Sequence, residues 1–175
     1  MSNIVVLIGV SGSGKSTLAT RVKGMTEDVK SVICSTDKFI EEEASSMGIT
    51  YKEMMDIIQK DNRFGELTGK FYDEIEDCIK NDYNIVIDRT NLTSGGRKAL
   101  IEKLKSMHEK HDKEEMEVMA VCLNLTRDEL DSRIAKRKEE TGKTIPDEVL
   151  AIQLKSFQIP NKEEGFDQVE VYEKA

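Results

Sequence analysis

The chain has 175 residues, of which 38% are hydrophobic and 34% are charged, and its formal net charge at pH 7 is −8. The length fits a single domain over residues 1–175 with a core of its own, and the acidic balance argues against a protein that coats long nucleic acid nonspecifically. No apolar run approaches the ~20 residues that span a bilayer, and a strand-like stretch begins at once, so neither a membrane partner nor a signal peptide is expected. Three widely spaced cysteines without metal-ligand spacing favour a reducing, cytoplasmic setting.

The amino-terminal end contains a predicted strand, a glycine loop and a helix in succession. Residues 4–8 form an apolar run, residues 16–22 are compatible with a helix, and residues 9–16 read Gly-Val-Ser-Gly-Ser-Gly-Lys-Ser. This is a complete G-x-x-x-x-G-K-[ST] phosphate-binding motif, in which glycines let backbone N–H groups point at phosphate oxygens and the helix start adds partial positive charge. The residues predicted to bind the nucleotide are Gly9, Ser11, Gly12, Ser13, Gly14, Lys15, Ser16 and Thr17.

Three side chains at the end of this motif are expected to contact the phosphates or Mg²⁺. Lys15 reaches the β- and γ-phosphates, the Ser16 hydroxyl binds Mg²⁺, and Thr17 donates to the α-phosphate. The Asn-Lys-x-Asp sequence that reads guanine in GTPases is absent, so ATP and Mg²⁺ are the expected cofactors. The alternative is a flexible turn before a helix that happens to contain a lysine.

A second predicted strand, residues 31–34, leads to Asp37 and Lys38. Ligands of open α/β sheets gather at the carboxyl ends of the strands, so Asp37 is expected beside the γ-phosphate, as the base that takes the proton from an attacking hydroxyl. Lys38 is expected on the substrate side. The alternative is that Asp37 serves as the N-cap of the next helix. Residues 41–82 are mostly helical by pattern and too long for a single crossover, which indicates a helical insertion near the active site.

A third predicted strand, residues 84–88, ends at Asp88 and is followed by Arg89, Thr90 and Asn91. A carboxylate after a buried strand resembles a Walker-B aspartate, so Asp88 is expected to hold Mg²⁺ directly or through water. Arg89, Thr90 and Asn91 are expected to bind the substrate, and Thr90 and Asn91 can alternatively fix Asp37. The competing interpretation is turn chemistry before the next helix.

The remaining pattern continues the alternation of strands and helices. Residues 100–107 carry apolar side chains at near-helical spacing, and residues 117–123 and 169–172 are predicted strands. The sequence therefore predicts a three-layer α/β/α sandwich with a mostly parallel central sheet, a helical insertion and a lid. His108 and His111 fall on a helix rich in Lys and Glu, where a solvated face is expected rather than a metal site.

Residues 126–146 are dense in charge of both signs and suit a helix–loop lid. Arg133 and Arg137 lie one helical turn apart on one face. A guanidinium there can neutralise the charge that spreads over a transferring phosphoryl group. The alternative is a solvated helix with salt bridges to Asp128, Glu129 and Glu139.

Taken together, the motifs resemble those of the P-loop kinases of the polynucleotide 5′-kinase type, which include the kinase domains of bacteriophage and animal end-healing enzymes. The resemblance runs through most of the chain: residues 9–17, Ser35-Thr36-Asp37, residues 85–92, and a late block from Arg137 through Thr144-Ile145-Pro146 and Phe157-Gln158-Ile159-Pro160 to Glu164-Gly165-Phe166-Asp167.

The resemblance implies that Lys15 and Ser16 bind the phosphates and Mg²⁺. It implies that Asp37 activates the 5′-hydroxyl of a DNA or RNA end, that Arg137 is the lid arginine and that Arg133 is its partner. Two positions depart from the phage-type pattern. The arginine that grips the substrate phosphate there is replaced here by Ile40, and Arg89 stands where an aspartate precedes Thr-Asn.

Three functions are consistent with these residues. The leading hypothesis is an ATP-dependent 5′-hydroxyl polynucleotide kinase whose partner is a single-stranded DNA or RNA end. The second is a kinase of the same fold that acts on a nucleoside, sugar or sugar nucleotide. The third is a binding module switched by nucleotide hydrolysis. Neither the oligomeric state nor the role of the 41–82 insertion can be read from the sequence.

Overall fold

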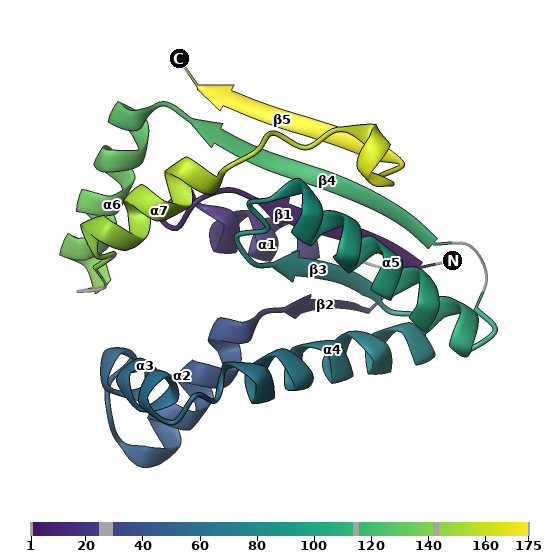
Figure 1. Ribbon diagram of the computed structural model, residues 1–175, viewed down its shortest axis with the longest axis horizontal. Coiled ribbons are helices and arrows are strands. Elements are labelled where there is room, and N and C mark those ends of the chain that lie inside the picture. Colours follow the sequence, from purple (N-terminus) through teal and green to yellow (C-terminus); the bar gives the residue numbers. More distant parts are fainter. Residues whose placement is uncertain (1, 25–29, 114–115, 142–143, 175) are drawn as a thin grey trace.

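The computed structural model describes residues 2–24, 30–113, 116–141 and 144–174, and its centre is a five-stranded sheet (Figure 1). The strand order is β2-β3-β1-β4-β5, and every neighbouring pair is parallel. The predicted parallel α/β fold is therefore confirmed. The strands are β1 (Ser2–Ile8), β2 (Ser31–Cys34), β3 (Asn84–Asp88), β4 (Met116–Leu125) and β5 (Gln168–Lys174).

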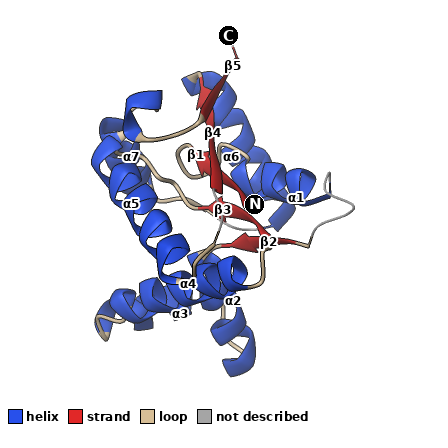
Figure 2. Cartoon of the chain, turned by 90° about the vertical axis from the view of Figure 1, so that its right-hand side faces the viewer, coloured by secondary structure: helices blue, strands red, loops and turns tan. Residues whose placement is uncertain are grey.

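Helices cover both faces of this sheet, as Figure 2 shows. Side chains of α1 pack on one face, and α4 and α5 pack on the other. The described helices are α1 (Lys15–Gly24), α2 (Thr36–Met47), α3 (Tyr51–Lys60), α4 (Phe64–Lys80), α5 (Ser94–Lys110), α6 (Arg127–Thr141) and α7 (Asp147–Ser156), with a short 3-10 turn η1 (Lys162–Glu164) before β5.

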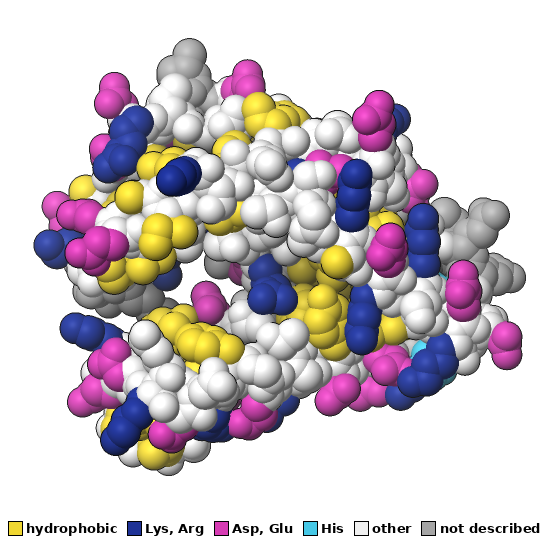
Figure 3. Space-filling view, viewed as in Figure 1, with side chains coloured by type: hydrophobic (Ala, Val, Ile, Leu, Met, Phe, Trp, Pro, Cys, Tyr) yellow, Lys and Arg dark blue, Asp and Glu magenta, His cyan; other side chains and the backbone are white. Residues whose placement is uncertain are grey.

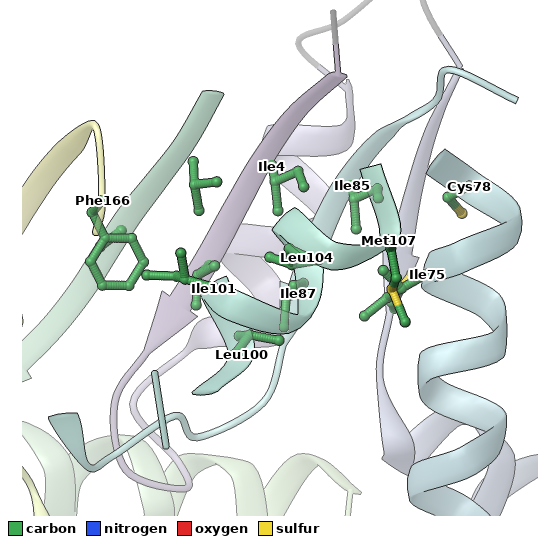
Figure 4. Close-up of a cluster of buried hydrophobic side chains, with 14 of the residues drawn as sticks. Ile4, Ile75, Cys78, Ile85, Ile87, Leu100, Ile101, Leu104, Met107 and Phe166 are labelled. Atoms are coloured by element: carbon green, nitrogen blue, oxygen red, sulfur yellow. The ribbon is translucent and has the colours of Figure 1, made fainter. Parts of the chain in front are cut away.

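The largest hydrophobic cluster lies between the sheet and the α4–α5 layer (Figure 4). The central strands β1 and β3 are apolar on consecutive residues because both of their faces are buried, whereas the edge strand β5 is mostly exposed. The helical faces predicted by spacing are the buried ones, including Ile75 and Ile79 of α4 and Leu100 and Leu104 of α5. This packing fixes the strand ends that carry the polar residues discussed below.

The predicted helical insertion is present as α2, α3 and the first half of α4. It has a small hydrophobic cluster of its own, made of Ile40, Ala44, Met54, Ile58 and Leu67. A capping box between Thr50 and Glu53 fixes the start of α3. The insertion is thus held together by its own core and is attached to the sheet through β2 and α4.

The expectation of a solvated histidine face is wrong for His108. Its side chain is buried, and its Nδ1 lies 3.0 Å from the carbonyl oxygen of Leu104, one turn earlier in α5. His111 is partly buried, and its Nε2 lies 2.6 Å from Glu76 Oε1 on α4. The Lys/Glu-rich pattern gave no sign of the His111 contact because the packing of α5 along α4 creates it, whereas the His108 contact lies within α5.

The predicted lid region contains α6 and the approach to α7, while residues 142–143 of the predicted range 126–146 lie outside the described residues. Ile134 and Ile145 pack with Val10, Leu130 and Leu150 in a cluster above the glycine loop. Among the described residues, no helix is long and apolar enough to cross a membrane.

Candidate active site

The carboxyl ends of β1, β2 and β3 bring the glycine loop, Asp37 and the segment 88–91 to one edge of the sheet. Figure 3 shows that the molecule is hollowed at this edge, between the α6–α7 part and the α2–α3 part, with charged side chains of both signs around the opening. The residues chosen from the sequence are therefore gathered in one region, as expected for an open α/β sheet.

Neighbouring segments hold the glycine loop in shape. The N–H of Gly9 donates to the carbonyl of Thr90 at 3.1 Å, and the N–H of Ser11 donates to Gln153 Oε1 of α7 at 2.7 Å. Gly14 has a φ of 99°, and a Cβ there would lie 2.8 Å from Nη1 of Arg133. Glycine is favoured at this position because the backbone is left-handed, and a Cβ there would also displace the Arg133 guanidinium from its contact.

Lys15 is buried beneath this loop, with 8% of its surface exposed. Its Nζ donates to the carbonyl of Val10 at 2.9 Å. Burial lowers the pKa of Lys15 to about 8, and the nearby charges of Asp88 and Asp37 partly oppose this shift. The ammonium group thus lies between the phosphate loop and both predicted carboxylates, in a place where a bound anion would stabilise its charge.

Ser16 and Thr17 follow Lys15 on the exposed first turn of α1. The first N–H groups of a helix have no carbonyl partner within the helix, and the helix dipole adds partial positive charge there. Together with the loop amides, this turn forms a seat for an anion such as a polyphosphate.

Asp88 and Ser16 are the residues that fit Mg²⁺. Asp88 is half-buried and takes part in no side-chain hydrogen bond or ion pair among the described residues. The described residues also contain no group of three or more His, Cys, Asp or Glu side chains that could hold a metal by themselves. Mg²⁺ commonly takes one or two carboxylates and obtains its other ligands from phosphates and water, so a lone carboxylate beside a phosphate seat suits it.

Asp37 is an exposed residue in the first turn of α2. The N-cap of this helix is Ser35, whose side chain accepts a hydrogen bond from the N–H of Asp37 at 3.2 Å. The alternative N-cap role for Asp37 is therefore wrong, and its carboxylate is left for other contacts. One of its oxygens, Oδ1, accepts a hydrogen bond from the hydroxyl of Tyr51 at 3.0 Å.

The other predicted substrate residues differ in what they contact. Lys38 is paired with Glu74 of α4. The Asn91 side chain donates to the carbonyls of Leu7 at 2.8 Å and Arg89 at 3.3 Å. Asn91 therefore braces the segment after β3 against β1 and does not fix Asp37.

A cavity of about 270 Å³ opens beside Asp37. Its walls come from the insertion, the β2–α2 junction and the end of β3, and it is lined by Thr36, Asp37, Ile40, Tyr51, Met55, Phe64, Leu67, Thr68 and Arg89. Most of these side chains are apolar or aromatic. Sequence reasoning missed Tyr51, Met55 and Phe64 because long-range packing brings them to Asp37, although Thr50 and Glu53 could have indicated that a helix starts at Tyr51.

Arg89 is a half-buried cation in the wall of this cavity. Its guanidinium carbon lies 4.9 Å from the centre of the Phe71 ring, a cation–π contact that restrains it. Within the described part of the chain, its side-chain N–H groups have no hydrogen-bonding or ion-pair partner, whereas the guanidinium of Arg63 pairs with Glu43 and Glu66. Arg89 thus presents free donors to whatever enters the cavity.

The two arginines predicted for the lid both lie within reach of the site, Arg133 by a direct contact with the phosphate loop and Arg137 through its charge. Arg133 donates from Nη1 to the carbonyl of Ser13 at 2.6 Å and from Nε to Glu129 at 2.9 Å, so one of the salt bridges of the alternative interpretation is present. The charge of Arg137 contributes to lowering the pKa of Lys15, which places it within electrostatic range of that ammonium group.

Comparison with known protein families agrees with this geometry. The description "AAA domain" matches residues 4–160, which include the glycine loop, Asp37 and the lid helix. The chain belongs to this AAA domain family. A search of curated proteins found no match to this chain.

Solved structures resemble this AAA domain in fold at low sequence identity. A fungal RNA kinase is 16% identical with a TM-score of 0.62, and the match covers 97% of this chain and 73% of that one. A gluconokinase from Sinorhizobium meliloti 1021 is 17% identical with a TM-score of 0.55, covering 98% and 82%. A chain of the Pnkp1/Rnl/Hen1 RNA repair complex is 24% identical with a TM-score of 0.58, covering 95% and 46%. The AAA domain thus has the nucleotide-binding fold of P-loop kinases.

Proposed function

We propose that this protein is an ATP-dependent kinase that phosphorylates the 5′-hydroxyl of a single-stranded DNA or RNA end. The observation that carries the proposal is the chemistry of the cavity beside Asp37. It combines a carboxylate, a guanidinium without a hydrogen-bonding partner among the described residues, and broad apolar walls that include Tyr51 and Phe64. A nucleotide end offers the complements of all three: a hydroxyl, a phosphate and a flat base.

The cavity suits a nucleotide end better than a neutral sugar. A sugar presents hydroxyl groups on every side and needs many hydrogen-bonding side chains around it, because each polar group that is buried unpaired costs about 1–3 kcal/mol. The walls here combine the apolar side chains of Ile40, Met55, Phe64 and Leu67 and the ring of Tyr51 with the polar groups of Thr36, Asp37, Thr68 and Arg89, which lie on one part of the lining and not on every side. Aromatic walls are the surfaces on which unpaired bases stack.

In the proposed reaction the 5′-hydroxyl oxygen attacks the γ-phosphorus of ATP. A phosphorus–oxygen bond forms to the acceptor, the bond from the γ-phosphorus to the β–γ bridging oxygen breaks, and ADP leaves with that oxygen. Asp37 takes the hydroxyl proton, and Lys15 and the loop amides stabilise the negative charge of the phosphates. Ser16 and Asp88 would hold Mg²⁺, which adds further positive charge beside the phosphates. Arg137 and Arg133 supply guanidinium groups from the lid side.

A γ-phosphate transfer assay tests the proposal. The protein, Mg²⁺ and ATP labelled in the γ-phosphate are incubated with a 5′-hydroxyl oligonucleotide, and label is expected at its 5′ end. Asp37→Asn should reduce this transfer steeply while ATP affinity is retained. Absence of transfer to DNA and RNA ends alike would refute the proposed function, and near-normal turnover of Asp37→Asn would refute the base assignment.

The role of Arg89 is tested by comparing acceptors with and without a negative charge on the first phosphate linkage. An oligonucleotide whose first linkage is a neutral methylphosphonate should be phosphorylated about 10- to 100-fold less efficiently than the natural one, because a charge-assisted hydrogen bond is lost. Arg89→Met should remove this preference. Arg21→Met, an exposed arginine on α1, is the matched control and should keep it. Equal use of both acceptors by the unaltered protein would rule out the Arg89 assignment without affecting the kinase assignment.

A small anionic acceptor is the second candidate. A cavity of about 270 Å³ is the size of one small molecule, and a sugar acid would also satisfy the free guanidinium of Arg89. The fold is shared with both an RNA kinase and a gluconokinase. Gluconate and a nucleoside, offered in the same assay, separate the candidates: label on gluconate and none on the oligonucleotide would favour the second.

A further inference from the structure

Tyr51 contacts the proposed catalytic base from an element outside the nucleotide-binding motifs. It is the first residue of α3, and its hydroxyl donates to Asp37 Oδ1 at 3.0 Å. Both side chains line the same cavity. The contact therefore lies where an acceptor hydroxyl must meet the carboxylate.

The carboxylate of Asp37 has little else to orient it. It is exposed on the first turn of α2, and within the described part of the chain the Tyr51 hydroxyl is the one group that donates to it. The terminal torsion of an aspartate is broad, so a carboxylate without partners samples many orientations. A hydrogen bond to Oδ1 restrains the group and leaves Oδ2 for the proton of the acceptor.

The position of Tyr51 is itself fixed. The preceding residue, Thr50, forms a capping box with Glu53: its hydroxyl accepts from the Glu53 N–H at 3.2 Å, and its N–H donates to the Glu53 carboxylate at 2.8 Å. The Tyr51 ring packs against the insertion core of Ile40, Ala44, Met54, Ile58 and Leu67. The hydroxyl is thus held at Asp37 by a folded unit and not by a loose loop.

The Tyr51 hydroxyl remains a donor at neutral pH. Burial of the phenol, followed by the charge of Asp37 and the hydrogen bond to it, raises the pKa of Tyr51 above its ordinary value. The proton therefore stays on the tyrosine, and the tyrosine does not act as a base.

We propose that Tyr51 is a positioning residue that orients the Asp37 carboxylate for proton abstraction, so that the helical insertion takes part in the chemical step as well as in forming the cavity. This inference rests on the proposed function, because it requires Asp37 to be the base. It differs from a role in acceptor binding, which would affect the Michaelis constant rather than the turnover number.

The test is Tyr51→Phe, which removes one oxygen and keeps the ring. Turnover of a 5′-hydroxyl oligonucleotide should fall about 10- to 100-fold, the effect of losing a hydrogen bond to a charged group. The Michaelis constants for ATP and the acceptor should stay within about twofold. Tyr83→Phe is the matched control: Tyr83 lies just before β3, at the opposite edge of the sheet, with Lys30 over its ring.

The double variant Tyr51→Phe/Asp37→Asn separates positioning from independent effects. If Tyr51 acts through the carboxylate, adding Tyr51→Phe to Asp37→Asn should cost nothing further. A full additional loss, or a raised acceptor Michaelis constant with unchanged turnover, overturns the inference in favour of a binding role. Undiminished turnover of Asp37→Asn alone would instead overturn the base assignment, and this inference with it.

Discussion

At the scale of single residues, the site is defined by charges that are buried or left without partners. Lys15 is buried under the glycine loop with a lowered pKa. Asp88 and Arg89 are half-buried and form no ion pair among the described residues. Such groups cost stability in a free protein, and they gain it when a ligand of opposite charge binds. Under the proposed function, the free site would gain stability from a polyphosphate with its cation at Lys15 and Asp88 and from an anionic acceptor at Arg89.

Lys15 gives a prediction for the ligand-free protein. Its pKa is about 8 when folded against 10.5 when exposed, so between these values the unfolded chain binds more protons and the free energy of unfolding rises with pH. The burial penalty, about 3 kcal/mol at most, is fully present below pH 8 and relieved as the pH approaches 10.5. Denaturant titrations across this window should show the rise in the unaltered protein relative to Lys15→Met. Parallel curves for the two proteins would contradict it.

At the scale of elements, the lid helix and the glycine loop are one packed unit. Arg133 of α6 donates to Ser13, and Ile134 and Ile145 pack above Gly12. Gln153 of α7 bonds both the N–H and the hydroxyl of Ser11. Motion of the lid therefore changes contacts made directly with the phosphate seat.

Gly14→Ala tests this packing. A Cβ at Gly14 would lie 2.8 Å from Arg133 Nη1, in a backbone with a φ of 99°. The variant should lose about 5- to 150-fold in ATP affinity, because a strained left-handed residue costs of order 1–3 kcal/mol and the loop must shift to relieve it. Fluorescence or calorimetric titration with ATP measures it.

Gly69→Ala serves as its matched control. Gly69 lies inside α4, and a methyl group added there would have no neighbouring atom within 4 Å. The change should therefore stabilise the helix by about 1 kcal/mol and leave ATP affinity unaltered. Equal ATP affinities for Gly14→Ala and Gly69→Ala would show that the loop tolerates the methyl group.

At the scale of the whole molecule, one buried ion pair joins the region 91–97 to the distant segment before β5. Arg97 of α5 and Glu164 of η1 are both buried and form two hydrogen bonds of 2.6 and 2.7 Å. Arg97 also donates to the carbonyls of Asn91 and Leu92, at 2.9 Å each. The segment after β3, α5 and the approach to β5 are therefore fixed by a single guanidinium.

Arg97→Met should be strongly destabilising, by about 3–5 kcal/mol, because it leaves the Glu164 carboxylate buried without its partner. Thermal or denaturant unfolding measures the loss. Adding Glu164→Gln should recover part of it, since the amide that remains is no longer charged. A single variant as stable as the parent would show that the pair is not needed for the fold.

The fold was largely readable from the sequence, whereas the acceptor side was not. Apolar runs predicted β1 to β4, the alternating residues 169–172 predicted β5, and the glycine motif predicted where a phosphate would bind. By contrast, the contacts of Asp37 with Tyr51 and of Arg89 with Phe71 join residues that are 14 or more positions apart on different elements. Local patterns carry no information about such contacts, because tertiary packing creates them. The burial of His108 escaped notice for the same reason.

The insertion core of Ile40, Ala44, Met54, Ile58 and Leu67 has a consequence for how such proteins diversify. This cluster is separate from the cores that support the phosphate seat, so substitutions that reshape it can change which molecule receives the phosphoryl group without disturbing the nucleotide. Chimeras that exchange residues 38–68 between P-loop kinases should therefore inherit acceptor preference from the donor of the exchanged segment and ATP handling from its recipient.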